Sequence, residues 1–337
     1  MKLLRFNLNH EPRSMSRHGV LLDGDRVVDL RKAAARYLAG EKGDIQAGEI
    51  AALRLPSDMV ELLQIGAPSR ELISETLAWV DGLADADSAT ALDGSKFIAP
   101  FSDCSLHAPV RRPGKAIAVG RNYSEHRAEM GNQLPTVVPA SWIKATSSII
   151  GPVRKIAKPD FVKQLDYETE LAIVIGKTCK NVPESRAYDV IAGYTIMLDI
   201  TARDIVRIEK REGHQLLGKM FDSFAPQGPW MVTPDEIGDP MNLAIRAHVN
   251  GEIRQDGNTS QMIFPIPKLI AYLSQMTLDA GDIILTGTPS GVAMGRKPDP
   301  EPFFMQPGDV LETEIEGIGK MRHEIVEETN PERSWQW

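Results

Sequence analysis

A short acidic motif followed at once by an apolar run constrains the fold of this chain more than any other feature. The motif, DYETE, spans residues 166–170, and the run LAIVI at residues 171–175 ends at Gly176. Such a run predicts a buried β-strand. Because side chains alternate along a strand, Asp166, Glu168 and Glu170 would share one face, where three carboxylates repel one another unless a cation holds them.

These crowded carboxylates indicate a hard divalent metal, although a solvated acidic sheet edge explains this segment alone equally well. A further carboxylate, Asp199, ends the apolar strand that begins at Gly193. The sequence predicts that Thr201 then starts a helix, with Asp204 in the capping-box position. Asp199 is therefore a candidate third ligand, and its alternative reading is an ordinary turn residue.

A candidate catalytic pair follows an earlier strand. Residues 120–131 (GRNYSEHRAEMG) predict a short helix with Ser124 as N-cap and Gly131 past its end. His126 and Glu129 are three residues apart, so a helix would place them on one face, where the carboxylate can orient the imidazole as a general base. The alternative is an exposed histidine–glutamate pair with no function. The sequence contains no HExxH zinc spacing.

Composition narrows the function classes. The chain has 337 residues and a net charge of −8, which argues against bulk nucleic-acid binding. Its two cysteines, Cys104 and Cys179, are too few for a disulfide framework or a thiolate metal site. No apolar run approaches the roughly 20 residues of a membrane span, and the first residues do not resemble a secretory signal. We therefore expect a cytoplasmic protein without a membrane partner.

The pattern of predicted elements indicates two domains, at residues 1–95 and 105–330. The first carries a hairpin around an Asp-Gly turn at 23–24, helices at about 31–39, 57–65 and 69–83, and a polar linker at 84–96. The second is rich in short strands, with no regular alternation of strand and helix. Its predicted strands lie at 115–119, 243–249, 283–285 and 310–315, and its proline-rich residues 296–307 predict an extended loop. This pattern is compatible with an α+β, β-rich fold.

Taken in order, these segments resemble the fumarylacetoacetate hydrolase family over roughly residues 105–326. The stretches that carry the resemblance are GRNYxxHxxE, Lys144 in WIK, DYExEL, LDxTARD, GKMFDSF at 218–224, NGE at 250–252 with Gln255, MIF at 262–264 and LTGTPSG at 285–291. The ordered set is specific, although no single stretch is. The resemblance implies a mixed β-roll or β-sandwich catalytic domain beside a small N-terminal α+β domain, commonly as a homodimer.

The resemblance also implies roles for individual residues. Glu168, Glu170 and Asp199 would bind Mg²⁺, or Mn²⁺ or Ca²⁺, since hard ions prefer all-oxygen ligands, and Asp166 would support them from outside. The implied catalytic residues are His126, Glu129 and Lys219, and the implied substrate-binding residues are Arg203, Lys144, Thr288 and Tyr123. Lys144 would sit at the mouth of the site on a lid segment. The loop holding Thr288 has an alternative reading as a tight turn.

One departure from the family pattern concerns Val206, which stands where many relatives carry a substrate-contacting glutamine. A valine cannot donate a hydrogen bond, so substrate contacts there must differ.

The implied activity is metal-dependent hydrolysis of a carbon–carbon bond in an acylpyruvate-like 2,4-dioxo acid of the fumarylacetoacetate or fumarylpyruvate type. In that reaction His126 and Glu129 would activate water while the metal stabilises an enolate. A hydratase, decarboxylase or isomerase of a 2-oxo-enoic acid in aromatic catabolism is the alternative. A non-catalytic protein that binds a metal or ligand on the same fold is a third reading.

Overall fold

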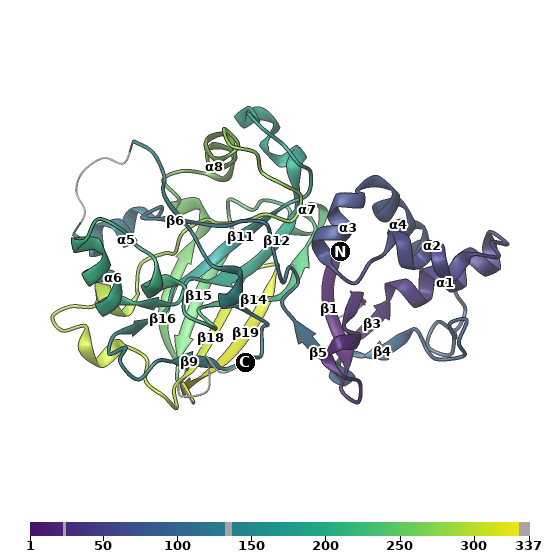
Figure 1. Cartoon of the computed structure of the whole chain (residues 1–337), viewed down its shortest axis with the longest axis horizontal. Coiled ribbons are helices and arrows are strands. Elements are labelled where there is room, and N and C mark those ends of the chain that lie inside the picture. The colour runs from purple at the N-terminus through teal and green to yellow at the C-terminus, as the bar shows by residue number, and fades with distance from the viewer. Residues whose placement is uncertain (23–24, 132–136, 330–337) are drawn as a thin grey trace.

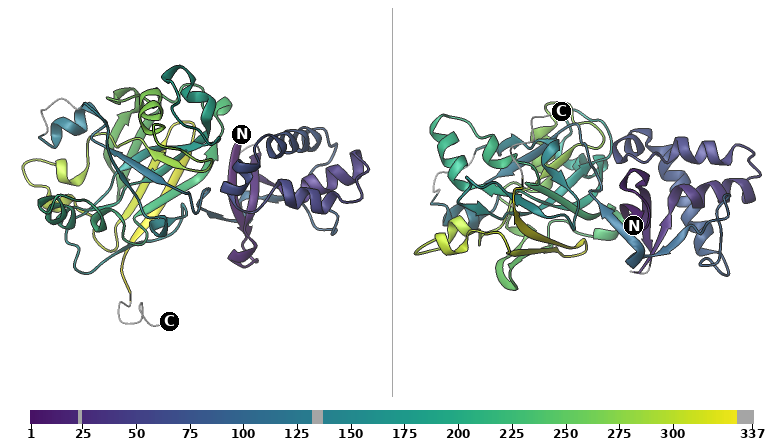
Figure 2. Two further views of the ribbon diagram at one scale, coloured as in Figure 1. Left: turned by 45° about the horizontal axis from the view of Figure 1, so that its top comes forward. Right: turned by 60° about the horizontal axis from the view of Figure 1, so that its bottom comes forward.

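The computed structural model describes residues 1–22, 25–131 and 137–329. A larger, strand-rich body lies beside a smaller N-terminal lobe that carries helices α1 to α4 (Figure 1). The other two views show the same separation (Figure 2). This arrangement confirms the predicted α+β, β-rich class.

A large mixed sheet runs through both parts of the molecule. Among the described residues its strand order is β4-β3-β2-β1-β14-β12-β11-β17-β6-β7, with β5 paired to β1 and β8 paired to β14. Its strands are β1 (Lys2–Leu8), β2 (Arg17–Leu22), β3 (Arg26–Asp29), β4 (Ile98–Pro100), β5 (Cys104–His107), β6 (Ala116–Gly120), β7 (Ala140–Ile143), β8 (Ile149–Ile150), β11 (Thr169–Ile175), β12 (Ile191–Leu198), β14 (Ala225–Val232) and β17 (Ile283–Leu285).

A second sheet packs across the body in the order β16-β15-β18-β19-β9. Its strands are β9 (Ile156–Lys158), β15 (Ala244–Val249), β16 (Glu252–Asn258), β18 (Val310–Ile315) and β19 (Gly319–Glu327). Two short strands, β10 (Leu165–Asp166) and β13 (Thr201–Ala202), pair with each other beside the acidic motif. The main core of the body lies between the sheets and includes fully buried Tyr167, Ile196 and Phe224.

The helices are α1 (Leu30–Glu41), α2 (Ala47–Arg54), α3 (Met59–Ile65), α4 (Ala67–Asp81), α5 (Ser124–Glu129), α6 (Arg203–Arg211), α7 (Pro234–Ile237) and α8 (Ile266–Leu273). No helix in the described parts of the chain is long and apolar enough to span a membrane. The sequence predicted α1, α3 and α4 but missed α2, where many residues are small and form only a weak apolar stripe.

Two helix starts differ from the prediction. Ser124 is the first residue of α5, and Tyr123 precedes it as N-cap without a side-chain bond. Thr201 lies in β13, where its hydroxyl donates to the Asp199 carbonyl, and α6 begins at Arg203. Pairing of Thr201 with Asp166 across β10 and β13 outweighs the local capping signal. The turn at residues 23–24 lies outside the described residues, but β2 and β3 form the predicted hairpin.

The N-terminal lobe and the body are joined by strand pairing and by a shared core. Lys2 and Leu3 of β1 pair with Val232 and Met231 of β14. A second hydrophobic cluster extends from the helices of the lobe to the side of the large sheet that carries Val174. We propose that residues 1–95 and 105–330 form two domains; the segment between them adds β4 to the N-terminal sheet.

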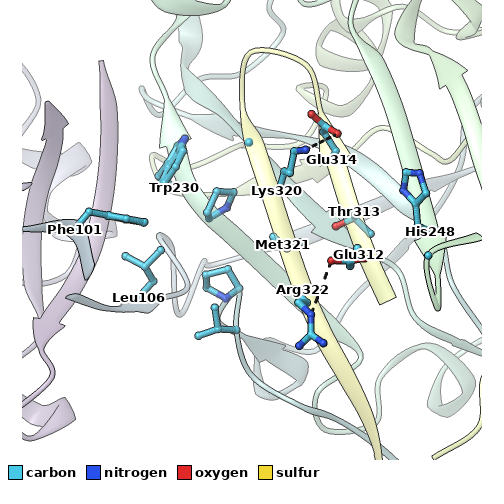
Figure 3. A pocket seen from close by; sticks show the side chains of 15 residues that line it. Phe101, Leu106, Trp230, His248, Glu312, Thr313, Glu314, Lys320, Met321 and Arg322 are labelled. Atoms are coloured by element: carbon cyan, nitrogen blue, oxygen red, sulfur yellow. Dashed lines mark ion pairs between the residues drawn. The ribbon is translucent and has the colours of Figure 1, made fainter. Parts of the chain in front are cut away.

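A groove of about 660 Å³ lies between the lobe and the second sheet (Figure 3). Phe101, Leu106 and Trp230 form its apolar side. The opposite side of the groove is formed by β18 and β19, whose charged side chains form ion pairs with each other. Glu314 pairs with Lys320 at 3.3 Å, and Glu312 pairs with Arg322 at 3.9 Å. The groove therefore offers no concentrated charge, and the acidic motif lies elsewhere in the body.

Candidate metal centre and its cavity

Pairing of neighbouring strands brings three carboxylates together. In the antiparallel pair of β11 and β12, Thr169 lies opposite Leu198, so Glu168 and Asp199 meet where the paired strands end. The Asp199 amide donates to the Glu168 carbonyl at 2.9 Å. One carboxylate oxygen from each of Glu168, Glu170 and Asp199 lies within 4.8 Å of the other two, and all three residues are buried. Burial excludes the solvated acidic edge.

Two lysine ammonium groups compensate part of this charge. Lys219 Nζ donates to Glu168 Oε2 at 2.8 Å and to Asp199 Oδ2 at 2.6 Å. Lys144 Nζ donates to Asp199 Oδ1 at 2.6 Å and to the Lys219 carbonyl at 2.6 Å. Lys144 has no exposed surface, so the expectation that it lies at the mouth of the site is wrong. Because the buried Asp199 carboxylate is stable only when a cation compensates its charge, the Lys144 side chain lies inside the protein.

Asp166 is not part of the trio, because its carboxylate is used elsewhere. Arg203 Nε donates to Asp166 Oδ2 at 2.7 Å, and Arg203 also reaches Glu168 Oε1 at 2.5 Å. Asp166 further accepts the backbone N–H groups of Ala293 and Met294. It thus fixes the orientation of Arg203 and the position of the loop around residue 293.

Glu170 carries the least compensated charge in the centre. Among the described residues, the hydrogen bond to its carboxylate comes from the Gly287 amide, at 2.7 Å. Burial, together with the neighbouring Asp199 and Glu168, raises the pKa of Glu170 well above its ordinary value. Burial also opposes ionisation of Glu168, but Lys219 and Arg203 outweigh it and lower the pKa of Glu168. Two adjacent carboxylates thus have opposite shifts.

The donor set fits a hard divalent cation. Three buried carboxylates converge with oxygen atoms alone, which is the ligand type that Mg²⁺ and Mn²⁺ prefer. In the part of the chain that the structure describes, no cysteine or histidine joins this trio. The raised pKa of Glu170 shows that one negative charge lacks a partner. A divalent ion would provide that partner.

His126 and Glu129 form the pair that the sequence predicted. His126 Nδ1 lies 2.7 Å from Glu129 Oε1, and the Gly291 amide donates to Glu129 Oε2 at 3.0 Å. Both side chains are largely buried, with exposed fractions of 8% for His126 and 17% for Glu129. Glu129 therefore holds the Nδ1–H tautomer, which leaves Nε2 of the imidazole as a proton acceptor.

A cavity of about 520 Å³ connects this pair with the carboxylates. It is lined by His126, Glu168, Glu170, Arg203, Lys219 and Thr288, together with Trp142 and Val206. The ring of Trp142 lies 5.0 Å from Lys219 Nζ. Helices α5 and α6 border the cavity at the end of the molecule away from the N-terminal lobe (Figure 1). The departure at Val206 thus gives this wall an apolar patch in place of an amide.

Of two predicted substrate contacts, Thr288 is already hydrogen-bonded within the protein and Tyr123 lies outside the cavity lining. The Thr288 hydroxyl donates to the Thr169 carbonyl and accepts from Gln255 Nε2, so its proton is already used. The Tyr123 hydroxyl is fully buried near Glu170, outside the cavity lining, and lacks a hydrogen bond among the described groups. Burial raises the pKa of Tyr123, so the phenol stays neutral. Direct contact of either residue with substrate stays a prediction.

Sequence reasoning missed other residues that line the cavity: Arg121, Lys210, His214 and Gln215. Lys210 follows Arg203 by seven residues on α6, a spacing that places both on one helix face. Helical periodicity could therefore have found Lys210. Arg121 stands in the GRNY stretch, but nothing in the sequence shows its direction.

Comparisons with known proteins agree with this geometry. The family model described as fumarylacetoacetate (FAA) hydrolase C-terminal matches residues 115–326. A mitochondrial oxaloacetate tautomerase from Xenopus laevis is 44% identical over 328 residues, covering 97% of this chain and 90% of that protein. The oxaloacetate tautomerase YisK of Bacillus subtilis is 37% identical over 316 residues, covering 91% and 95% respectively.

A solved structure shows what a similar protein binds. It is maleylpyruvate hydrolase from Sphingobium sp. SYK-6 in complex with manganese(II) ion and pyruvate. Its sequence is 30% identical to this chain, the TM-score is 0.68, and the match covers 97% of this chain and 99% of that one. The similarity spans both the body and the N-terminal lobe.

Proposed function

Because the chain belongs to the fumarylacetoacetate hydrolase family, whose named members include tautomerases, isomerases and hydrolases, we propose that it is a divalent-metal-dependent keto–enol tautomerase of a 2-oxo acid such as oxaloacetate. The observation that carries this proposal is the His126–Glu129 pair facing the buried carboxylates across one cavity. A base beside a metal centre is what proton transfer next to a carbonyl group requires.

The residues divide the work of proton transfer. Glu168, Glu170 and Asp199 would hold Mg²⁺ or Mn²⁺, which when bound supplies Lewis-acid polarisation of the 2-oxo group. His126 Nε2 accepts the proton from the carbon next to that group and returns it to the oxygen to give the enol, so the reaction needs no other reactant. Glu129 stabilises the imidazolium form of His126 in between. The positive charge of Lys219 stabilises the negative charge that develops on the oxygen.

The test is to follow the ultraviolet absorbance of the enol form of oxaloacetate with purified protein. We expect the protein to accelerate its decay in Mg²⁺ but not in EDTA. His126→Ala is expected to lower kcat by about 10² or more, while His10→Ala, an exposed histidine in the N-terminal lobe, retains full activity. Acceleration that is unchanged in EDTA, or intact in His126→Ala, contradicts the proposal.

A second candidate is hydrolysis of a carbon–carbon bond in an acylpyruvate. The same His126–Glu129 pair can activate water, and the similar Sphingobium structure is that of a maleylpyruvate hydrolase. Pyruvate release from acetylpyruvate or fumarylpyruvate, measured with lactate dehydrogenase, distinguishes the candidates. Incubation with a 2-oxo-enoic acid, followed by product analysis, detects hydration, decarboxylation or isomerisation.

We further propose that the protein acts as a homodimer in the cytoplasm, with a small-molecule oxo acid as its ligand. Light scattering of the purified protein tests the dimer, and fractionation of cells tests the compartment. A monomer at micromolar concentration contradicts the first part.

A further inference from the structure

The outer part of the cavity holds two cations that are not neutralised. Arg121 and Lys210 both line the cavity. In the parts of the chain that the structure describes, neither side chain forms an ion pair or hydrogen bond with a carboxylate. By contrast, Arg203 and Lys219, which also line the cavity, are each paired with a buried carboxylate. Arg121 and Lys210 are both exposed, so this positive charge lies on the solvent side of the cavity.

The fold holds Lys210 in this position. It lies in the last turn of α6, seven residues after Arg203, so both side chains project from the face of the helix that borders the cavity. Glu209 accepts the amides of Leu216 and Leu217 and thereby folds the next loop back onto α6. Partial burial lowers the pKa of Lys210, and the charges of Arg121 and Arg203 lower it further. The fold thus keeps the positive charges of Lys210, Arg121 and Arg203 close together.

Arg121 is positioned by an unusual backbone conformation. Its φ angle is 58°, in the left-handed region that costs a residue with a Cβ about 1 kcal/mol or more. The next residue, Asn122, fixes the turn: its side-chain amide donates to the Phe264 and Thr286 carbonyls and its side-chain oxygen accepts the Phe264 amide. A strained residue that its neighbours hold in place is typical of ligand sites.

We propose that Arg121 and Lys210 bind the second carboxylate of a dicarboxylic 2-oxo acid whose 2-oxo end lies at the metal centre. This inference rests on the proposed function and defines its substrate class as a dianion. Gln215 lines the same cavity, and its buried Nε2 has no hydrogen-bond acceptor among the described residues, so it adds a donor for a carboxylate oxygen. The volume of about 520 Å³ has room for such an acid.

Two probes that differ in a single charge test the proposal. Oxaloacetate carries both carboxylates, whereas its 4-ethyl monoester keeps the 2-oxo acid end and loses the distal charge. Calorimetric titration in Mg²⁺ gives the Kd of each probe, and the enol assay gives KM and kcat. We expect Arg121→Gln and Lys210→Met each to raise the Kd and KM of oxaloacetate roughly tenfold, with kcat and the Kd of the monoester little changed.

Arg211→Gln is the matched control, because it removes one positive charge from the same helix turn at an exposed position outside the cavity lining. It is expected to leave both Kd values unchanged. Equal weakening of both probes by Arg121→Gln and Lys210→Met overturns the proposal, since a general distortion of the site affects the shared 2-oxo end as well. Unchanged affinity for oxaloacetate in both variants overturns it too.

The outcome separates this inference from the proposed function. If the protein does not accelerate tautomerisation but still binds the dianion through Arg121 and Lys210, the proposed reaction fails and the carboxylate subsite stands. If tautomerisation is fast and both probes bind the variants as they bind the unchanged protein, the reaction stands and the subsite fails.

Discussion

At the scale of single residues, the three carboxylates of the centre are not equivalent. Lys219 contacts Glu168 and Asp199, whereas the hydrogen bond to Glu170 comes from a backbone amide. An amide dipole compensates less charge than an ammonium group does. Without a metal ion, Glu170 is therefore the carboxylate whose ionisation is least favourable, and with a metal ion we expect it to be a ligand.

Glu170→Gln is accordingly expected to have opposite effects in the two states. Without metal, the variant should be more stable to urea by about 1 kcal/mol, because a like charge is removed while the side-chain oxygen can still accept the Gly287 amide. With Mg²⁺ at a hundredfold Kd, the unchanged protein should gain about 2.7 kcal/mol, and the variant much less.

Glu71→Gln, at an exposed position on α4, serves as the control and should gain as much from Mg²⁺ as the unchanged protein. If Glu170→Gln keeps the full Mg²⁺ effect, then Glu170 is not a ligand.

The sequence predicted the residues of the centre better than their surroundings. Period-two alternation and strand ends put forward Asp166, Glu168, Glu170 and Asp199 as candidates, because these depend on local pattern. The family resemblance, not the pattern, implied that Asp166 stands outside the ligand set. The burial of Lys144 depends on Asp199, 55 residues away, and no local pattern contains that information. The same holds for Arg121, whose direction is set by hydrogen bonds from Asn122 to segments around residues 264 and 286.

At the scale of elements, a loop residue with a positive φ angle binds helix α5 through a hydrogen bond from its backbone amide. Gly291 has a φ angle of 102°, and its amide donates to Glu129 on α5. A Cβ at this position would lie 2.1 Å from the Arg254 carbonyl oxygen. Gly308 has nearly the same φ angle, 98°, but a Cβ there would meet nothing within 4 Å.

Comparison of Gly291→Ala with Gly308→Ala separates the cost of a steric clash with Arg254 from the cost of a positive φ angle. Both substitutions should lose about 1–2 kcal/mol from the left-handed backbone. Gly291→Ala should lose a further 1–3 kcal/mol from the overpacked contact and should also lower kcat, because Glu129 loses its backbone partner. Urea unfolding and the enol assay measure these effects. Equal losses of stability in the two variants would show that the backbone near Gly291 relaxes freely.

Strands and helices with a strong hydrophobic pattern were predicted from the sequence, and those with a weak pattern were missed. Apolar runs bounded by glycine or aspartate gave β11, β17 and β18 nearly at their observed bounds. Where a local cap signal competed with strand pairing, as at Thr201, the pairing with Asp166 won because it buries both residues. Helix α2 escaped detection since Ala47 and Ala51 are its buried contacts and alanine contributes little apolar periodicity.

At the scale of the whole molecule, lobe and body share one hydrophobic cluster. Residues of α1 and α4 in the lobe belong to the same cluster as Val174, Met197 and Met231 of the body. We therefore expect urea unfolding to be a single transition, with coincident curves from far-ultraviolet circular dichroism and tryptophan fluorescence. Mg²⁺ should shift both curves together. Two separate transitions would show that the lobe unfolds independently.

Buried histidines in both parts make the stability of the molecule depend on pH. Burial lowers the pKa of His18 in β2 and of His323 in β19 to about 4 in each case. Below the unfolded-state histidine pKa of about 6.5, the unfolded chain binds protons at these histidines and the native state does not. The free energy of unfolding therefore falls as the pH decreases toward 4. The loss is on the order of 3 kcal/mol for each histidine.

The variant His323→Asn tests this effect, because an amide can keep the hydrogen bond to the Arg154 carbonyl without titrating. Its unfolding free energy should vary less between pH 6.5 and 4.5 than that of the unchanged protein. An identical slope would mean that His323 does not contribute to the pH dependence.

The buried position of Lys144 has a kinetic consequence for how the site is filled. Its side chain is fully buried against Asp199 and does not line the cavity, so we expect a metal ion and an oxo acid both to enter from the cavity side. We therefore expect ordered loading, with the ion first and the acid second. An acid in place covers the exit of the ion, so EDTA should strip the metal from the ligand-free protein much faster than from the saturated one.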